Sequence, residues 1–104
     1  RRLKRIAKRG PDFVHMAQFL DAEAARLAGR DSLCLERYRA AAERALRQGY
    51  RHHAALILER QARHYKQVGR VSEALSLLNR AIELYADWGA HAKVAALRRE
   101  LPQG

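Results

Sequence analysis

Apolar residues recur at helical spacing in two neighbouring blocks in the second half of the chain, on either side of Gly69. The first block carries Ala55, Leu58, Ala62 and Tyr65, and the second carries Ala74, Leu75, Leu78, Ala81, Ile82 and Tyr85. Each predicted helix has one apolar stripe and one charged face, so neither helix is stable alone. A short connection through Gly69 and Arg70 brings the second helix back antiparallel onto the first. The pattern therefore predicts a helical hairpin.

The first half of the chain shows the same pattern, with one apolar stripe before Gly29 and another before Gly49. The stripe residues are Phe13, Ala17, Leu20, Ala24 and Leu27 in the first helix, and Cys34, Tyr38, Ala41, Ala45 and Leu46 in the second. We therefore expect two hairpins, over residues 12–48 and 52–88. A fifth helix over residues 90–101 is expected to cap the second hairpin, because its apolar side carries Val94, Leu97 and Leu101.

The two hairpins match each other at a shift of 40 residues. The matching pairs are Ala22 and Ala62, Gly29 and Gly69, Ser32 and Ser72, Leu35 and Leu75, Ala41 and Ala81, Glu43 and Glu83, and Gly49 and Gly89. Because both helices of each hairpin contribute, the match indicates internal duplication and not merely shared periodicity. The sequence predicts an all-α solenoid of stacked antiparallel hairpins over residues 11–104. Residues 1–10 are expected to be the basic end of an upstream helix or a linker.

The second hairpin resembles the tetratricopeptide motif. In that motif a small residue lies midway along the first helix and an aromatic residue follows three positions later. A glycine closes the turn, and two alanines seven positions apart line the second helix. The matching residues here are Ala62, Tyr65, Gly69, Ala74 and Ala81. The period of about 40 residues exceeds the 34 of the tetratricopeptide, so we expect longer helices or longer turns.

The stretch from His15 to Pro102 also resembles the C-terminal end of the helical-repeat region in large bacterial signalling ATPases. The most specific match is Trp88, Gly89, Ala90, Ala92, Lys93 and Val94, followed by Leu97, Leu101 and Pro102. In that family an AAA-like or STAND-like ATPase module is joined to the repeats, together with a kinase, a cyclase or a transcription-activating domain. The resemblance implies a non-catalytic regulatory module of signal transduction or transcription, which passes a protein or small-molecule signal to neighbouring catalytic domains.

The chain has 21 basic and 11 acidic residues and a net charge of +10, but six of the basic residues precede the first acid. The remainder carries 15 basic residues against 11 acidic ones, a net charge of +4, so the excess belongs mainly to one end. A basic helical domain that binds nucleic acid through residues 1–9 and its arginine-rich helix faces is the alternative function. No apolar run approaches the roughly 20 residues that span a bilayer, so we expect a cytoplasmic setting.

The sequence contains no G-x-S-x-G elbow, no glycine-rich phosphate loop and no H-E-x-x-H motif, so no enzyme activity or cofactor is expected. The five histidines include no i, i+4 pair, and we expect rings at the surface or partly packed, without a metal site. Cys34 is expected to be a buried, inert thiol, and Glu59 to form a solvated ion pair. Trp88 is expected to pack the second hairpin against the capping helix.

The first helix of each hairpin is expected to line a concave binding face. The groove positions of the motif select Met16, Phe19, Glu23 and Arg26 from the first hairpin, and Leu56, Glu59, Arg63 and Lys66 from the second. Apolar and basic groups in this mixture suit an acidic, partly apolar peptide, or a neighbouring domain of the same chain. A structural spacer that forms homodimers through the helix over residues 13–27 is the third alternative, because two hairpins fall short of the usual three repeats.

Overall fold

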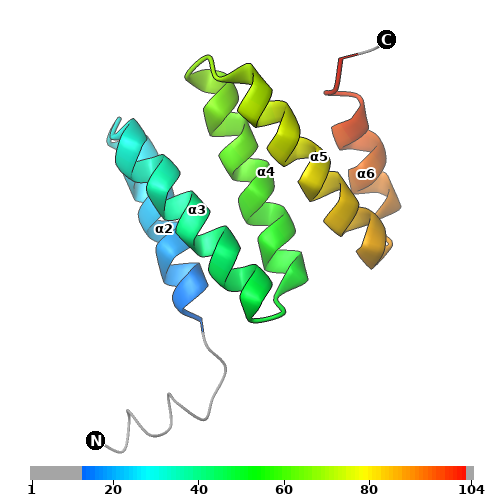
Figure 1. Cartoon of the computed structure of the whole chain (residues 1–104), viewed down its shortest axis with the longest axis horizontal. Helices are drawn as coiled ribbons and strands as arrows, with labels where there is room; N and C mark the ends of the chain where they lie inside the picture. Colours follow the sequence, from blue (N-terminus) through cyan, green and yellow to red (C-terminus); the bar gives the residue numbers. More distant parts are fainter. Residues whose placement is uncertain (1–12, 103–104) are drawn as a thin grey trace, which may run out of the picture.

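The computed structural model describes residues 13–102, and this part of the chain contains five α-helices and no strand. The helices are α2 (Val14–Leu27), α3 (Asp31–Arg47), α4 (Arg51–Gln67), α5 (Val71–Trp88) and α6 (His91–Arg98). Each helix packs against the next one in the chain, and α4 lies in the middle (Figure 1). The all-α prediction is confirmed. Helices α2 and α3 lie within the first expected hairpin, residues 12–48, and α4 and α5 cover the second, residues 52–88, with α4 beginning one residue earlier at Arg51. The basic end of an upstream helix, or linker, expected over residues 1–10 lies outside the described residues.

All four long helices end in the same way. Each is followed by a glycine in the left-handed region, with φ between 73° and 86°, and these glycines lie 20 residues apart at Gly29, Gly49, Gly69 and Gly89. At the third turn the Gly69 N–H donates to the Lys66 carbonyl at 3.1 Å, and the Arg70 N–H donates to the Tyr65 carbonyl at 2.8 Å. This Schellman pair recurs at the other three helix ends and satisfies carbonyls that the helix leaves unpaired. The helix boundaries are therefore set by glycine positions.

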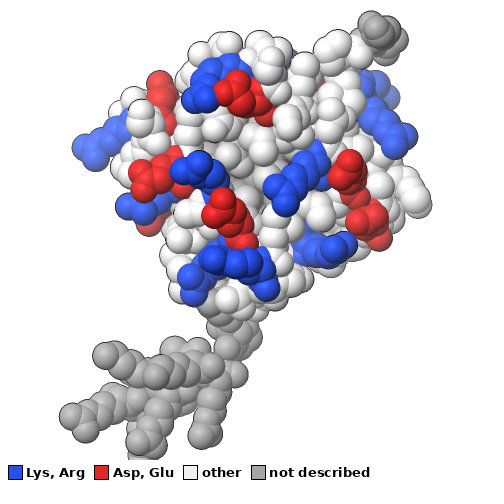
Figure 2. Space-filling model, viewed as in Figure 1, with Lys and Arg blue, Asp and Glu red and all other residues white. Residues whose placement is uncertain are grey.

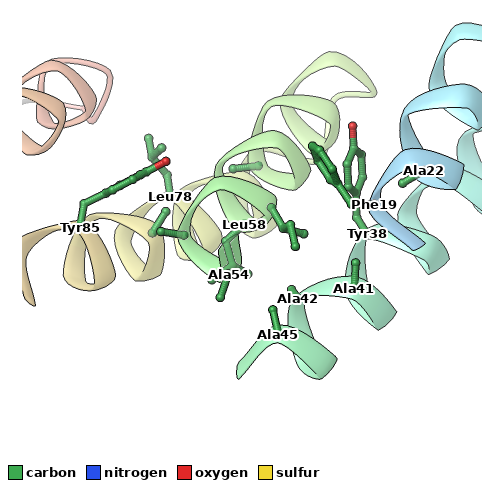
Figure 3. Packing of buried hydrophobic residues seen from close by; sticks show 14 of the residues in the cluster. Phe19, Ala22, Tyr38, Ala41, Ala42, Ala45, Ala54, Leu58, Leu78 and Tyr85 are labelled. Atoms are coloured by element: carbon green, nitrogen blue, oxygen red, sulfur yellow. The ribbon is translucent and has the colours of Figure 1, made fainter. Parts of the chain in front are cut away.

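Small residues form the centre of the core. Three alanines of α3, labelled in Figure 3, are buried in this core; they are Ala41, Ala42 and Ala45. Alanine lets two helix backbones approach closely, while larger side chains fill the spaces that remain. Phe19 and Tyr38 lie side by side with ring centroids 6.1 Å apart (Figure 3), and Leu58 of α4 is also buried. The core is therefore continuous from the first hairpin into α4.

The apolar stripe expected on the first helix does not face the core. Leu20 is 62% exposed, Leu27 is 78% exposed and Phe13 is 53% exposed, and the two alanines of the stripe are also exposed. The buried face of α2 instead carries His15, Phe19, Ala22 and Ala25. Both faces of α2 contain apolar residues, so the spacing alone could not decide which face the rest of the molecule covers. The structure corrects this part of the prediction.

The last helix is shorter than expected. α6 covers eight residues and ends at Arg98, whereas the sequence pattern extended to residue 101. The Leu101 amide donates to the Arg98 carbonyl at 3.1 Å, so residues 99–101 form a turn. Pro102 disfavours helical conformation at Leu101, which accounts for the early end. No helix within residues 13–102 is long and apolar enough to cross a lipid bilayer.

Candidate partner-binding site

Two equivalent surfaces, one on each hairpin, lie beside the helix that follows the hairpin. The first slot consists of Ala22, Glu23, Arg26, Asp31, Cys34, Leu35 and Tyr38, and the second slot consists of Ala62, Arg63, Lys66, Val71, Ala74, Leu75 and Leu78. Each residue of the second slot comes 40 positions after its counterpart in the first. The 17-residue helix α4 follows the first slot, and the 8-residue helix α6 follows the second.

The first slot is closed by α4. The His64 ring of α4 lies 6.5 Å from the Tyr38 ring, centroid to centroid, and its Nε2 is 3.2 Å from Asp31 Oδ1. One turn earlier on α4, Arg60 Nη1 donates to Glu23 Oε1 at 3.2 Å. Tyr38 is completely buried and donates its hydroxyl hydrogen bond to Glu23. Desolvation and the bond to this carboxylate raise the pKa of Tyr38 well above its usual value.

The second slot is open. All seven of its residues line a cavity of about 270 Å³, which the chain after α6 closes on one side with Glu100, Leu101 and Pro102. Val71, on the wall of this cavity, is 53% exposed although it is apolar. The cavity exists because α6 ends after eight residues and leaves uncovered the half of the slot that α4 covers in the first hairpin.

Arg63 forms the charged edge of the second slot. Its Nη1 and Nη2 donate to the two carboxylate oxygens of Glu100, both at 3.0 Å, and Nη2 also lies 3.0 Å from Glu59 Oε2. These carboxylates raise the pKa of Arg63, with the hydrogen bond to Glu100 the larger cause. Lys66, one turn further along α4, has no ion-pair partner among residues 13–102 and is exposed. The slot therefore presents one neutralised and one available cation beside an apolar wall.

The pair of Arg63 and Glu100 is the charge-reversed counterpart of the pair of Glu23 and Arg60. In both pairs the partners are 37 residues apart, and each residue of one pair comes 40 positions after its counterpart in the other. Glu100 therefore contacts the second hairpin at the position that is equivalent to the one at which Arg60 contacts the first hairpin. Helix α6 and the turn after it therefore pack against the second hairpin in the way that the corresponding part of α4, 40 residues earlier, packs against the first.

The buried carboxylate of Glu59 joins α4, α5 and α6 through hydrogen bonds. Its carboxylate accepts hydrogen bonds from Tyr85 of α5 at 2.9 Å, Arg63 of α4 at 3.0 Å and Lys93 of α6 at 3.1 Å. Burial alone would raise the pKa of Glu59, but the hydrogen bonds from Arg63, Lys93 and Tyr85 outweigh burial and hold this pKa below its usual value. The expectation of a solvated ion pair is wrong for Glu59, whose side chain is 5% exposed.

The eight residues predicted to line a binding face differ in their burial and in their position. Phe19 and Glu59 are buried, Met16 is partly buried against the core, and Leu56 is 37% exposed. The remaining residues occupy equivalent positions in the two slots; they are Glu23 and Arg26 in the first, and Arg63 and Lys66 in the second.

Among the residues that the structure describes, Arg63 and Lys66 are the members of that set that line the mainly apolar cavity of about 270 Å³. The sequence reasoning missed Val71, Ala74 and Leu78 as residues of this cavity. The sequence contained one signal of this cavity, because the first slot has Asp31 where the second has Val71. A charged residue at one position and an apolar residue at its counterpart indicate that the two positions have different surroundings.

Two of the five histidines, His15 and His64, are more buried than expected. His15 is completely buried and its Nε2 lies 2.7 Å from Nδ1 of His53, so the two rings join α2 to α4. Tyr50 stacks on both rings, with its centroid 4.6 Å from that of His15. Within residues 13–102 no group of three His, Cys, Asp or Glu side chains is placed to hold a metal ion.

The sequence also made predictions for Cys34 and Trp88. Cys34 is completely buried, and desolvation raises its pKa to about 11, so the thiol stays protonated at neutral pH. Trp88 is 54% exposed, and its ring lies against that of His52 of α4, with centroids 3.8 Å apart and the ring planes tilted by 30°. Trp88 therefore lies against α4, a contact that the sequence analysis did not predict.

Comparison of the chain with models of known protein families, with curated proteins and with solved structures found no match.

Proposed function

We propose that this chain is a non-catalytic interaction module built from tetratricopeptide-like hairpins, and that it acts within a longer bacterial signalling or transcription-regulatory protein. The regular 20-residue spacing of identical helix ends supports the repeat interpretation. The signalling role rests on the resemblance of residues 15–102 to the repeat region of signalling ATPases. In such a module binding at a surface of the repeats alters the neighbouring catalytic domains.

The observation that carries the proposed function is the open second slot. An apolar cavity with a few polar groups at its edge is the usual form of a binding site. Here the apolar wall includes Val71, Leu75 and Leu78, and Lys66 supplies a positive charge that no acidic residue among residues 13–102 neutralises. These features favour a partner peptide that carries an apolar anchor and an acidic side chain.

The distribution of charge favours a protein partner over nucleic acid. On the face drawn in Figure 2, acidic residues are interspersed among the basic ones. A nucleic-acid interface normally presents a continuous basic patch or stripe to the phosphates.

A charge reversal at Lys66 tests the proposed function. A fluorescent peptide of leucine and glutamate residues serves as the probe, and anisotropy measures its binding. We expect Lys66→Glu to weaken binding about tenfold, because it places a like charge beside the acidic side chain of the probe. Arg47→Glu is the matched control, since Arg47 is an exposed arginine outside the second slot and forms no ion pair within residues 13–102.

Equal binding to wild type and Lys66→Glu would contradict the proposed site. Tight capture of a labelled nucleic acid, with affinity falling steeply between low and moderate salt, would instead favour the nucleic-acid alternative.

Self-association is a second candidate function, and the exposed stripe on α2 favours it. Leu20 and Leu27 are more than half exposed on the same helix face, and adjacent exposed apolar residues of this kind commonly mark protein contacts. The proposed occupant is α2 of a second copy. Sedimentation across protein concentration tests it: a dimer that Leu20→Glu converts to a monomer supports the role, and a monomer at all concentrations excludes it.

A further inference from the structure

We infer that the second slot receives an amphipathic helix from a partner, in the place that the last two turns of α4 take on the first slot. The inference rests on the proposed function, namely that the second slot binds a partner, and it specifies the conformation and the register of the bound segment. The internal contact between α4 and the first hairpin is the template. This mode of recognition lays the apolar face of a helix into a groove.

The register of the template is fixed by the turns. α4 begins two residues after Gly49, and α6 begins two residues after Gly89. The charge-reversed ion pairs show that residue 100 lies where residue 60 lies one unit earlier. Helix α4 continues for seven residues beyond Arg60, to Gln67, whereas Pro102 prevents the corresponding continuation after Glu100. The open part of the slot is therefore two helical turns long.

The residues that differ between the two slots indicate which side chain of the bound helix the second slot accepts. In the first slot His64 is placed against Tyr38 and Asp31. The counterparts of these two residues in the second slot are Leu78 and Val71, both apolar, so a side chain in the place of His64 would meet an apolar wall. The occupant therefore inserts an apolar side chain there, because a polar one would lose its hydrogen bonds to water without replacement.

The charge at the edge sets the second requirement. Arg63 is already neutralised by Glu100, whereas Lys66 is exposed without an ion-pair partner among the described residues. An acidic residue three or four positions from the apolar anchor lies on the same face of the incoming helix and can reach Lys66. Glu100, Leu101 and Pro102 remain in place as the end wall. The partner is thus an acidic amphipathic helix with a bulky apolar anchor.

Two peptides of about 15 residues test this inference, because helices of that length are marginally stable in water. One carries leucine and glutamate at i, i+3, i+4 and i+7, and the other is the same peptide with its central residue replaced by proline. We expect the first peptide to bind and the second to bind at least about tenfold more weakly, because proline breaks the helix. Circular dichroism should show helix gained on binding.

A variant that fills the cavity provides a second test of the inference. Ala74→Leu places a larger side chain into the second slot and should weaken binding of the helical peptide at least about tenfold. Ala92→Leu is the matched control, because Ala92 is exposed on α6 and does not line the cavity, and it should leave binding unchanged. A thermal unfolding curve of each variant confirms that it is folded before binding is compared.

The outcomes separate the inference from the proposed function. If both peptides bind equally and Lys66→Glu weakens both, the site stands and helical recognition is overturned. If the helical peptide binds and Ala74→Leu has no effect, the bound helix lies elsewhere and the inference fails. If neither peptide binds, both the inference and the proposed site are rejected.

Discussion

The two slots of this molecule consist of residues that correspond at a shift of 40 positions, but the first slot is covered by a helix and the second is open. In the first slot, α4 supplies Arg60 to Glu23 and His64 to Asp31, and Tyr38 is completely buried. In the second slot, the equivalent helix ends early and leaves an apolar cavity of about 270 Å³. A surface that serves stability in one unit is therefore available for binding in the next. The comparison also shows that a short helix can leave a cavity open on the hairpin that precedes it.

Substitution of the large residue at the centre of each slot should have the greatest effect. Tyr38→Ala removes a fully buried ring and its hydrogen bond to Glu23, and we expect a loss of about 4 kcal/mol in unfolding free energy. Leu78→Ala, at the equivalent position, should cost about 2 kcal/mol, because its site already adjoins an open cavity. Urea denaturation measures both values. Equal losses would contradict the difference between a closed and an open slot.

Removal of the Glu59 carboxylate should be next in size. Glu59→Gln takes away the charge that Arg63, Lys93 and Tyr85 share, and we expect a loss of about 2 kcal/mol at neutral pH. The figure lies at the low end for a buried ion pair, because the Arg63 and Lys93 side chains are 46% and 42% exposed and can be solvated.

The same variant should change the pH dependence of stability. The pKa of Glu59 is lowered in the folded state, so its contribution is fully present above the unfolded carboxyl value of about 4.3 and is lost as the pH falls below it. Wild type should therefore lose stability more steeply than Glu59→Gln in acid. Glu83→Gln, the same change at an exposed position, is the control. Parallel acid curves for wild type and Glu59→Gln would contradict the role of this carboxylate.

An added leucine distinguishes the slots most directly. Cys34 and Ala74 are equivalent, but Cys34 lies under α4 with no exposed surface, whereas Ala74 lines the cavity. Cys34→Leu should cost about 2 kcal/mol through overpacking, and Ala74→Leu should change stability by less than about 1 kcal/mol. Thermal unfolding of the two variants provides the measurement. A greater loss for Ala74→Leu would mean that the second slot cannot accept a larger side chain.

Substitution of the turn glycines should have the same effect in both hairpins. Gly29 and Gly69 have φ of 73° and 83°, and open space surrounds the position of an added Cβ at each. Gly29→Ala and Gly69→Ala should therefore each cost about 1 kcal/mol, through backbone strain alone. Equal losses in chemical denaturation would show that the slots differ while the turns do not. A much larger loss at one turn would indicate that its hairpin depends on a contact absent from the other.

The turns and the helices could be predicted from the sequence because they depend on local residues. Glycine is the residue that adopts the left-handed conformation at the end of a helix, so Gly29 and Gly69 marked boundaries without any knowledge of tertiary contacts. The amphipathic stripes then placed the helices between them. The exception is α2, where Leu20 and Phe19 lie on different faces and only the packing of α3 and α4 determines which face is buried.

The candidate site could be predicted only in part. Arg63 and Lys66 were selected by their place in the repeat, but the cavity beside them depends on where α6 ends and on how Glu100 folds back. The burial of Glu59 and His64 was not predicted, because charged and polar residues are usually exposed. Their partners come from other helices, and a single sequence does not specify such long-range pairs.

The dominance of contacts between consecutive helices has a consequence for how the chain folds. Extensive packing joins α2 to α3, α3 to α4, α4 to α5 and α5 to α6. Folding therefore closes only short loops, which cost little chain entropy and favour rapid folding. Either hairpin can act as the nucleus, and the native protein should open from its ends inward. Amide hydrogens of the eight-residue α6 should then exchange with solvent sooner than those of α4, which has a packed neighbour on each side.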